Sequence, residues 1–200
     1  SGFGGVNAMG SFTYDYCAMS GAGGSGLGKQ MVMTNCIVSG DPKGAMLQGT
    51  KLGTRDSLAG YKIHDTLLVI GDNENGSSYS IATSNNIDIQ RCIFRTGKDN
   101  ENNSRALKFA NVKTVVLDNN DFCSGVKFQT CSAVRMNTNR MSISPDGGRN
   151  SHDSTYHHML EIITSCDDII VRDLQFATCP AGRVLSMADS TNIKLRCFGS

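Results

Sequence analysis

The residues best suited to chemistry lie together between positions 142 and 159, in the segment SISPDGGRNSHDSTYHHM. Three of the four histidines fall in this segment, beside two carboxylates that could act as acid and base. We predict Asp146 and Asp153 as the candidate catalytic residues. The predicted substrate contacts there are Arg149, His152, Tyr156 and His157, with Tyr156 as a stacking platform for a sugar.

The same segment also fits a simpler interpretation, an exposed polar loop. Its residues 145–148, Pro-Asp-Gly-Gly, form a strong turn signal. A metal site built from His152, His157 and His158 is a weaker alternative, because no HExxH motif or comparable paired spacing supports it. P-loop, dinucleotide, GxSxG and kinase motifs are also missing, so we expect no metal and no cofactor.

Paired carboxylates are the second kind of candidate, because glycoside hydrolysis needs an acid and a base or nucleophile at a fixed separation. The possible pairs are Asp72 with Glu74, Asp99 with Glu101, and Asp167 with Asp168. The last pair falls in a turn between two expected strands, where acidic residues are ordinary. We therefore predict turn chemistry, not catalysis, for Asp167 and Asp168.

A repeated unit must position all of these residues. Residues 79–94, YSIATSNNIDIQRCIF, have apolar side chains with a period of two on either side of a polar turn. Residues 107–122, 126–141 and 185–200 superpose on this unit without a gap, and 160–176 with one inserted residue. Residues 29–40 resemble its second half, and further strands are expected at 12–16, 45–48 and 66–70. Such repeats indicate a solenoid, in which like side chains stack from rung to rung.

The alignment predicts four inward columns. They are Tyr79, Leu107, Val126, Leu160 and Leu185; Ile81, Phe109, Phe128, Ile162 and Met187; Ile87, Val115, Val134, Ile169 and Ile193; and Ile89, Leu117, Met136, Val171 and Leu195. An antiparallel sandwich of hairpins is the competing architecture, but the internal turn is not of the two-residue Asn-Gly or Asp-Gly type. Segments of variable length all follow the position of Phe94, so functional loops are expected at one side of the coil.

The units NNIDIQRCIF, NVKTVVLDNNDF and CDDIIVRDLQF resemble rungs of right-handed parallel β-helices of the pectate-lyase-like superfamily, most closely bacteriophage tailspikes or tail fibres. The resemblance covers about residues 79–200. It implies an all-β, right-handed, single-stranded parallel β-helix with loops on one side. It also implies a virion tail protein, usually a trimer, that binds host surface polysaccharide. The Gly-His-Gly and Arg-x-Lys motifs of the pectinases are missing here.

Outward positions of the repeat add a possible binding strip. Lys108 and Lys127 stand between the first two inward columns, and Arg135, Arg172, Lys194 and Arg196 follow on the next outward columns. Such a strip could hold an anionic polysaccharide, so Lys108 and Lys127 are predicted substrate-binding residues. The alternative is a solvated face that discourages edge pairing.

Composition limits the remaining possibilities. The net charge is +1, so no global field points to nucleic acid, and no apolar run is long enough for membrane insertion. The eight cysteines lack CxxC and zinc-finger spacing, which favours reduced packing or ladder residues and folding in a reducing cytoplasm. We expect a Gly/Ser-rich cap or linker at 1–28 and a β-helix at 29–200 that continues or is capped beyond residue 200.

Three functions remain open. The first is a tailspike-like module of the virion tail, made in the cytoplasm of a bacterial host, that binds host polysaccharide and assembles as a homotrimer with other tail proteins. The second is a polysaccharide hydrolase or lyase. The third is a structural fibre or adhesin segment without a sugar site, and a secreted or cell-surface location is the alternative to the virion.

Overall fold

The computed structural model describes residues 11–21, 30–40, 60–70, 79–96, 105–122, 125–142, 159–178 and 185–199. Every regular element in these ranges is a β-strand. The seventeen strands belong to one sheet, and all of their pairings are parallel. The predicted all-β parallel β-helix is therefore confirmed. Among the described residues, no helix is long and apolar enough to cross a membrane.

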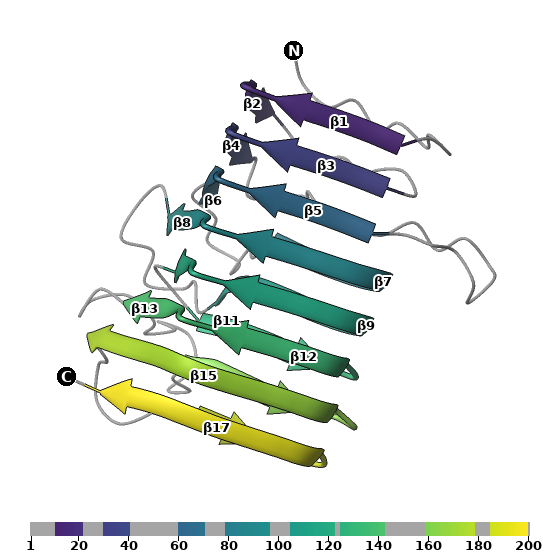
Figure 1. The fold of residues 1–200 in the computed structure, drawn as a ribbon, viewed down its shortest axis with the longest axis vertical. Helices are drawn as coiled ribbons and strands as arrows, with labels where there is room; N and C mark the ends of the chain where they lie inside the picture. The colour runs from purple at the N-terminus through teal and green to yellow at the C-terminus, as the bar shows by residue number, and fades with distance from the viewer. Residues whose placement is uncertain are drawn as a thin grey trace, which may run out of the picture.

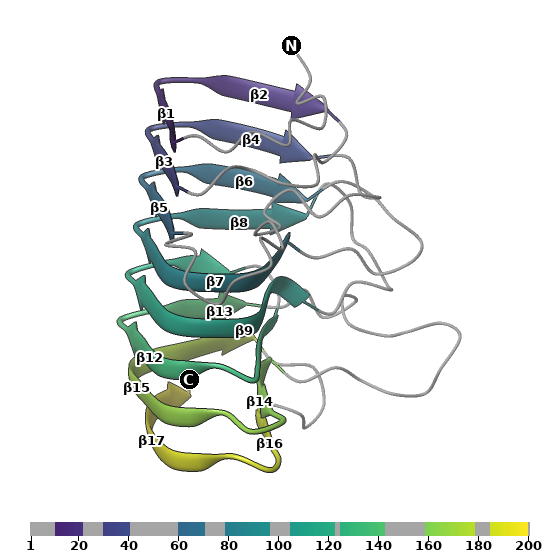
Figure 2. The same ribbon diagram turned by 90° about the vertical axis from the view of Figure 1, so that its right-hand side faces the viewer.

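The strands stack in successive rungs, and the coil is right-handed when followed from the N-terminal rung to the C-terminal rung (Figures 1 and 2). The rungs are β1 (Ser11–Asp15) with β2 (Ala18–Gly21), β3 (Gln30–Thr34) with β4 (Ile37–Gly40), β5 (Gly60–His64) with β6 (Leu67–Ile70), β7 (Tyr79–Gln90) with β8 (Ile93–Thr96), β9 (Arg105–Asp118) with β10 (Asp121–Phe122), β11 (Gly125–Gln129) with β12 (Ser132–Asn137) and β13 (Arg140–Ser142), β14 (Leu160–Ile163) with β15 (Asp167–Thr178), and β16 (Leu185–Met187) with β17 (Thr191–Gly199).

The rungs build three faces. Face A contains the first halves of β7 and β9 with β11, β14 and β16. Face B contains β1, β3, β5, the second halves of β7 and β9, β12, and the first halves of β15 and β17. Face C contains β2, β4, β6, β8, β10, β13 and the ends of β15 and β17. Each segment of variable length follows a face C strand, as the sequence predicts.

The strand register confirms the four predicted columns. On face A, for example, Tyr79 pairs with Leu107, and Val126 pairs with both Leu107 and Leu160. The partial rung at 29–40 is also confirmed, because Met31 and Ile87 both pair with Tyr61. These columns supply one core cluster, in which Phe109 and Phe128 stack with ring centroids 5.2 Å apart.

Two rungs were not recognised in the sequence as full copies of the repeat. Residues 60–70 form β5 and β6, although only the strand at 66–70 was expected there. Residues 11–21 form β1 and β2, which pair with β3 and β4 and lie inside the segment expected to be a cap or linker. The expected strand at 45–48 lies outside the described residues. Each of these rungs is described as two short strands, on faces B and C alone, and so carries only about half of the repeated apolar pattern.

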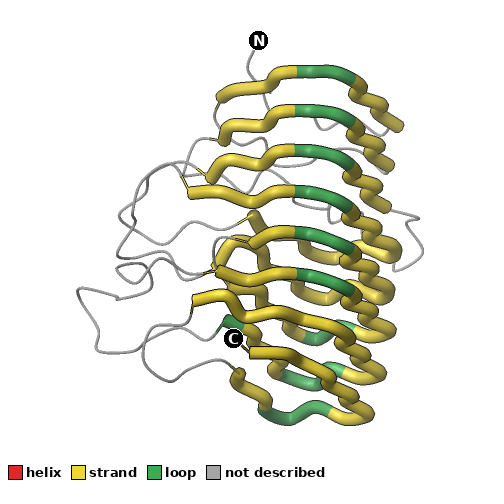
Figure 3. Tube along the Cα trace, turned by 60° about the vertical axis from the view of Figure 1, so that its left-hand side comes forward, coloured by secondary structure: helices red, strands yellow, loops and turns green. Residues whose placement is uncertain are grey.

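The corner between faces B and C has the same backbone conformation in the first seven described rungs. Its first residue has a positive φ in each case: Tyr16, Asn35, Asp65, Arg91, Asn119, Thr138 and Asp173. Several of these residues are Asn or Asp, which tolerate the left-handed region better than other non-glycine residues. The N–H of each of the first six donates to a carbonyl of the next rung, as from Asn119 to Asn137 at 3.0 Å. Figure 3 shows this corner as green segments that recur from rung to rung.

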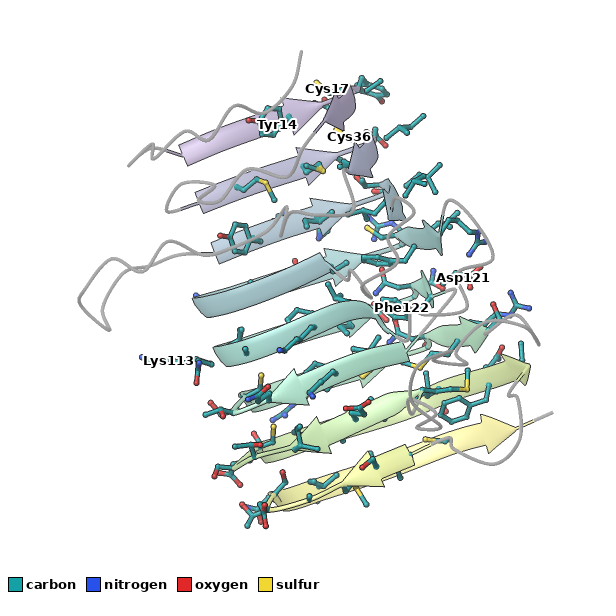
Figure 4. All side chains as sticks on the ribbon, turned by 180° about the vertical axis from the view of Figure 1, so that it is seen from behind. Tyr14, Cys17, Cys36, Lys113, Asp121 and Phe122 are labelled. Atoms are coloured by element: carbon teal, nitrogen blue, oxygen red, sulfur yellow. The ribbon has the colours of Figure 1, made fainter. Side chains whose placement is uncertain are left out.

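The second residue of this corner points into a polar ladder within the core. Asn120 Oδ1 accepts from the Cys92 N–H at 2.9 Å, and Asn139 Oδ1 accepts from the Asn120 N–H at 3.0 Å. Cys17, Cys36 and Thr66 occupy the same position in the first three rungs, and Figure 4 shows Cys17 and Cys36 in successive rungs at this corner. The six described cysteines are free thiols, and four of them are buried, as expected for packing or ladder residues.

Candidate functional site

Most of the predicted site residues lie outside the described residues. These are Asp146, Arg149, His152, Asp153, Tyr156 and His157, together with the pairs Asp72 with Glu74 and Asp99 with Glu101. The predictions for these residues therefore stay predictions. Lys108 and Lys127 are described, and the polar surface of the described rungs can be built around them.

Lys108 and Lys127 stand on the outer side of face A, as predicted. They pair with each other in register, and Lys127 pairs in turn with Glu161 of the next rung. Lys127 Nζ lies 3.4 Å from Glu161 Oε2, with only 14% and 7% of the two side chains exposed. Because both charges are largely buried, each is needed to compensate the other. Lys108 also interacts with another group. Both lysines are therefore partnered side chains in this structure.

The rest of the predicted basic strip is also partly paired. Arg135 on β12 donates from Nη2 to Asp168 Oδ2 at 2.6 Å and from Nη1 to the Asp168 carbonyl at 2.7 Å. Arg196 on β17 lies 3.6 Å from Asp173. The positive charge of the strip is therefore offset by carboxylates of adjacent rungs.

Asp167 and Asp168 are the first two residues of β15, directly after the corner that follows β14, so they adjoin the predicted turn. Asp167 Oδ1 accepts from the Thr191 hydroxyl at 2.7 Å and from Asn192 Nδ2 at 2.8 Å, and these bonds lower the pKa of its carboxyl group. Asp168 has a φ of 53° and pairs with Arg135. Both carboxylates thus connect neighbouring corners of the coil.

A second set of polar side chains, the His64 cluster, lies on face B and its corner at β5 and β7. It consists of His64, Asp65, Asp88, Gln90 and Arg91. His64 Nε2 lies 3.1 Å from Asp88 Oδ2, and Gln90 Nε2 donates to Asp88 Oδ1 at 2.8 Å. The His64 side chain is only 13% exposed and that of Asp88 35%, so the pair is held partly away from solvent.

Within the His64 cluster, Arg91 connects Gln90 to Asp65, the residue at the corner. Its Nε and Nη2 each donate to one carboxylate oxygen of Asp65 at 2.7 Å, and its Nη1 donates to Gln90 Oε1 at 3.2 Å. This bidentate bond holds the pKa of the Asp65 carboxyl below its usual value. The network fixes the rotamers of all five side chains without occupying every lone pair of the Asp88 carboxylate.

A third group, the Asp121 cluster, lies on the outer side of face C. Arg95 Nη2 donates to Asp121 Oδ2 at 3.0 Å, and Arg140 Nη1 lies 3.6 Å from the same oxygen. The three residues come from successive rungs, because Asp121 pairs in register with both Ile93 and Arg140. In the described ranges, Asp121 Oδ1 is buried and has no hydrogen-bond partner.

The donors and acceptors of these clusters bond mainly to one another across adjacent rungs. The described ranges contain no group of three or more His, Cys, Asp or Glu side chains that could hold a metal ion. Sequence analysis missed His64, Asp88 and Arg91, because 60–70 was not aligned as a rung. Aligning residues 60–70 with the repeat places His64 beside Gln90. This alignment is the sequence signal that would have predicted the cluster. No family model matches this chain, and no curated protein and no solved structure matches it either.

Proposed function

We propose that this chain is a tailspike-like module of a virion tail that binds host cell-surface polysaccharide through the outer faces of its β-helix. The observation that carries the proposal is the His64 cluster, a set of interlocked donors and acceptors on adjacent rungs. A sugar hydroxyl both donates and accepts, so it can bond to Asp88 while accepting from a nearby cationic side chain. The resemblance of the repeat to tailspike rungs supports the choice of polysaccharide and of a bacterial host, although fold alone does not imply function.

Glycan binding tests this proposal directly. Immobilised capsular polysaccharides and O-antigens are presented to the protein, and binding is measured by biolayer interferometry. We expect Asp88→Asn and Arg91→Gln to weaken binding of the recognised glycan about tenfold or more, because each removes a charge-assisted hydrogen bond. Asp189→Asn, at an exposed corner of the last described rung, is the matched control. Binding of no glycan in the panel, or equal binding by all variants, would overturn the proposal.

A second candidate function is cleavage of the polysaccharide, and the His64–Asp88 pair favours it specifically. A carboxylate 3.1 Å from an imidazole can orient that ring as a general base. Release of reducing ends or of unsaturated sugars from a bound glycan would identify the reaction as hydrolysis or elimination. Loss of cleavage with retained binding in His64→Gln would assign it to this pair. Loss in Asp146→Asn or Asp153→Asn would assign it to the segment at 142–159.

The proposed assembly is a homotrimer joined to other tail proteins. A column of apolar side chains on the outer side of face C supports it, because Leu67 pairs with both Ile37 and Ile93, which are 53% and 41% exposed. An exposed apolar stripe of this kind is typical of a contact surface. Light scattering after size exclusion should give three chains per particle, and Ile37→Lys should give one. A monomeric parent protein would contradict the trimer.

A further inference from the structure

Two cysteines occupy the same corner position in adjacent rungs. Val134 pairs with Ile169, which places Cys131 beside Cys166 three residues before each of them. The Cys131 N–H donates to Cys166 Sγ at 3.4 Å, and the Asp167 N–H donates to the Cys131 carbonyl at 3.0 Å. Adjacent strands are about 4.8 Å apart, which lies within the Cα separation that a disulfide can bridge.

The surroundings give the two thiols different reactivity. Cys166 Sγ accepts the hydrogen bond from the Cys131 N–H, and interaction with the Cys131 side chain is the largest cause that lowers the pKa of the Cys166 thiol. The interaction with Cys166, together with burial, raises the pKa of the Cys131 thiol. Because the thiolate is the nucleophile, Cys166 is the residue that reacts first with an oxidant.

Both residues are 1% exposed, which restricts the oxidant that can reach them. Burial disfavours attack on a bulky, charged disulfide such as oxidised glutathione, whereas hydrogen peroxide is small and uncharged. The corner residue before Cys166 is exposed, so the path from solvent is short.

We propose that Cys131 and Cys166 form a reversible redox site, in which peroxide oxidises Cys166 and Cys131 then closes a disulfide between the two rungs. The site is independent of the proposed binding of polysaccharide, so either proposal can fail alone. The disulfide would join β11–β12 to β14–β15 and would restrain the unfolded chain across the segment between them.

The chemistry balances with peroxide as the only co-reactant. The Cys166 thiolate attacks one peroxide oxygen, the O–O bond breaks, and the leaving hydroxide takes up the proton that Cys166 lost, giving a sulfenic acid and water. The Cys131 sulfur then attacks the Cys166 sulfur. The S–S bond forms as the S–O bond breaks, and the hydroxide leaves with the Cys131 proton as a second water. A dithiol reductant returns both thiols.

Peptide mapping tests the site in the intact protein. After treatment with a small excess of peroxide and alkylation, trypsin should release peptides 128–135 and 150–172 joined by a disulfide. The apparent Tm should rise by roughly 5 °C or more and return after reduction. Cys92 lies between Thr66 and Asn120 in its own column, so its peptide at 92–95 should remain alkylated.

Two variants make the test specific. Cys166→Ser keeps a side chain that the column accepts, because Ser190 already accepts from the Cys166 N–H there, and it should abolish both the cross-link and the rise in Tm. Cys92→Ser should retain both. The proposal is overturned if the two peptides stay separate, if Cys166 becomes sulfinic acid without joining Cys131, or if either residue joins a different cysteine.

Discussion

At the scale of single residues, the corner between faces B and C places unlike side chains in one backbone conformation. Asn119 and Thr138 follow each other in this corner with φ of 54° and 53°. Asn tolerates this region because its short polar side chain bonds locally, whereas a β-branched residue is strained there. The two positions therefore form a matched pair within one protein.

We predict that Thr138→Asn stabilises the protein by about 1 kcal/mol, because it relieves left-handed strain at an exposed corner. Urea denaturation followed by circular dichroism measures the change. The reverse substitution, Asn119→Thr, is the control and should destabilise by a similar amount. If Thr138→Asn lowers the free energy of unfolding with an unchanged m-value, the contacts of the Thr138 side chain stabilise the protein by more than its backbone strain destabilises it.

The ion pair of Asp65 and Arg91 predicts a pH dependence. The hydrogen bond from Arg91 lowers the pKa of Asp65 below 3.8 in the folded state, so the pair contributes stability above about pH 4. That contribution is lost as pH falls through the folded-state pKa. The difference in Tm between the parent and Asp65→Asn should therefore be largest at pH 5 to 7 and should shrink below pH 4. A difference that does not change with pH would contradict this assignment.

At the scale of elements, Asn120 and Asn139 of the polar ladder connect the rungs at the corner between faces B and C. Asn120 Oδ1 accepts from the Cys92 N–H at 2.9 Å, and its Nδ2 donates to the Ile89 carbonyl at 2.9 Å and to Asn139 Oδ1 at 3.0 Å. These bonds link three rungs, so one side chain satisfies buried backbone groups of a neighbouring rung. The stack of Phe94 on Phe122, with centroids 4.9 Å apart, packs beside it on face C.

We predict that Asn120→Ala costs about 2–4 kcal/mol of unfolding free energy, because it leaves buried polar groups without partners. Asn120→Thr should cost clearly less. In the same column Thr66 Oγ1 accepts from the Cys36 N–H at 3.4 Å, so a hydroxyl can replace part of the amide there. Chemical denaturation of both variants measures the difference. If both variants lose the same unfolding free energy, the hydrogen bonds of Asn120 contribute little, and the loss comes from the smaller packed volume.

At the scale of the whole molecule, stability depends on how many neighbours a rung has. Interior rungs pair on both sides, and their core side chains, such as Phe109 and Val134, are fully buried. Leu185 and Met187 of the last described rung continue the same columns but are 37% and 49% exposed. In a solenoid, stability is approximately a sum of rung terms and nearest-neighbour terms, so a rung that pairs on one side only receives less stabilisation than a rung that pairs on both sides.

Native-state hydrogen exchange should therefore show a gradient along the stack. In a polypeptide of residues 1–200, we expect the amides of β9 and β12 to exchange only through global unfolding, and those of β16 and β17 to exchange through local opening of lower free energy. Exchange followed by mass spectrometry at several denaturant concentrations separates the two regimes. Uniform protection along the whole stack would contradict a nearest-neighbour account of stability.

The sequence by itself determined the columns and the class of fold. A period of two in apolar residues admits one register in which like side chains stack, since a slip of one residue would turn every core side chain outward. Face A and face B of the last five rungs, including the pairing of Ile87 with Val115, were therefore predictable. The rungs at 11–21 and 60–70 were not recognised as full copies, because each is described as two short strands that carry about half of the repeated pattern.

Only the tertiary structure decided which polar groups meet. His64 and Asp88 are 24 residues apart, and the Cys131 N–H reaches a sulfur 35 residues away. Both contacts connect adjacent rungs, and the segments between rungs differ in length. The separation along the chain therefore carries no fixed signal. Apolar columns are repeated and can be aligned, whereas a polar pair occurs once, and stacking alone brings its two members together.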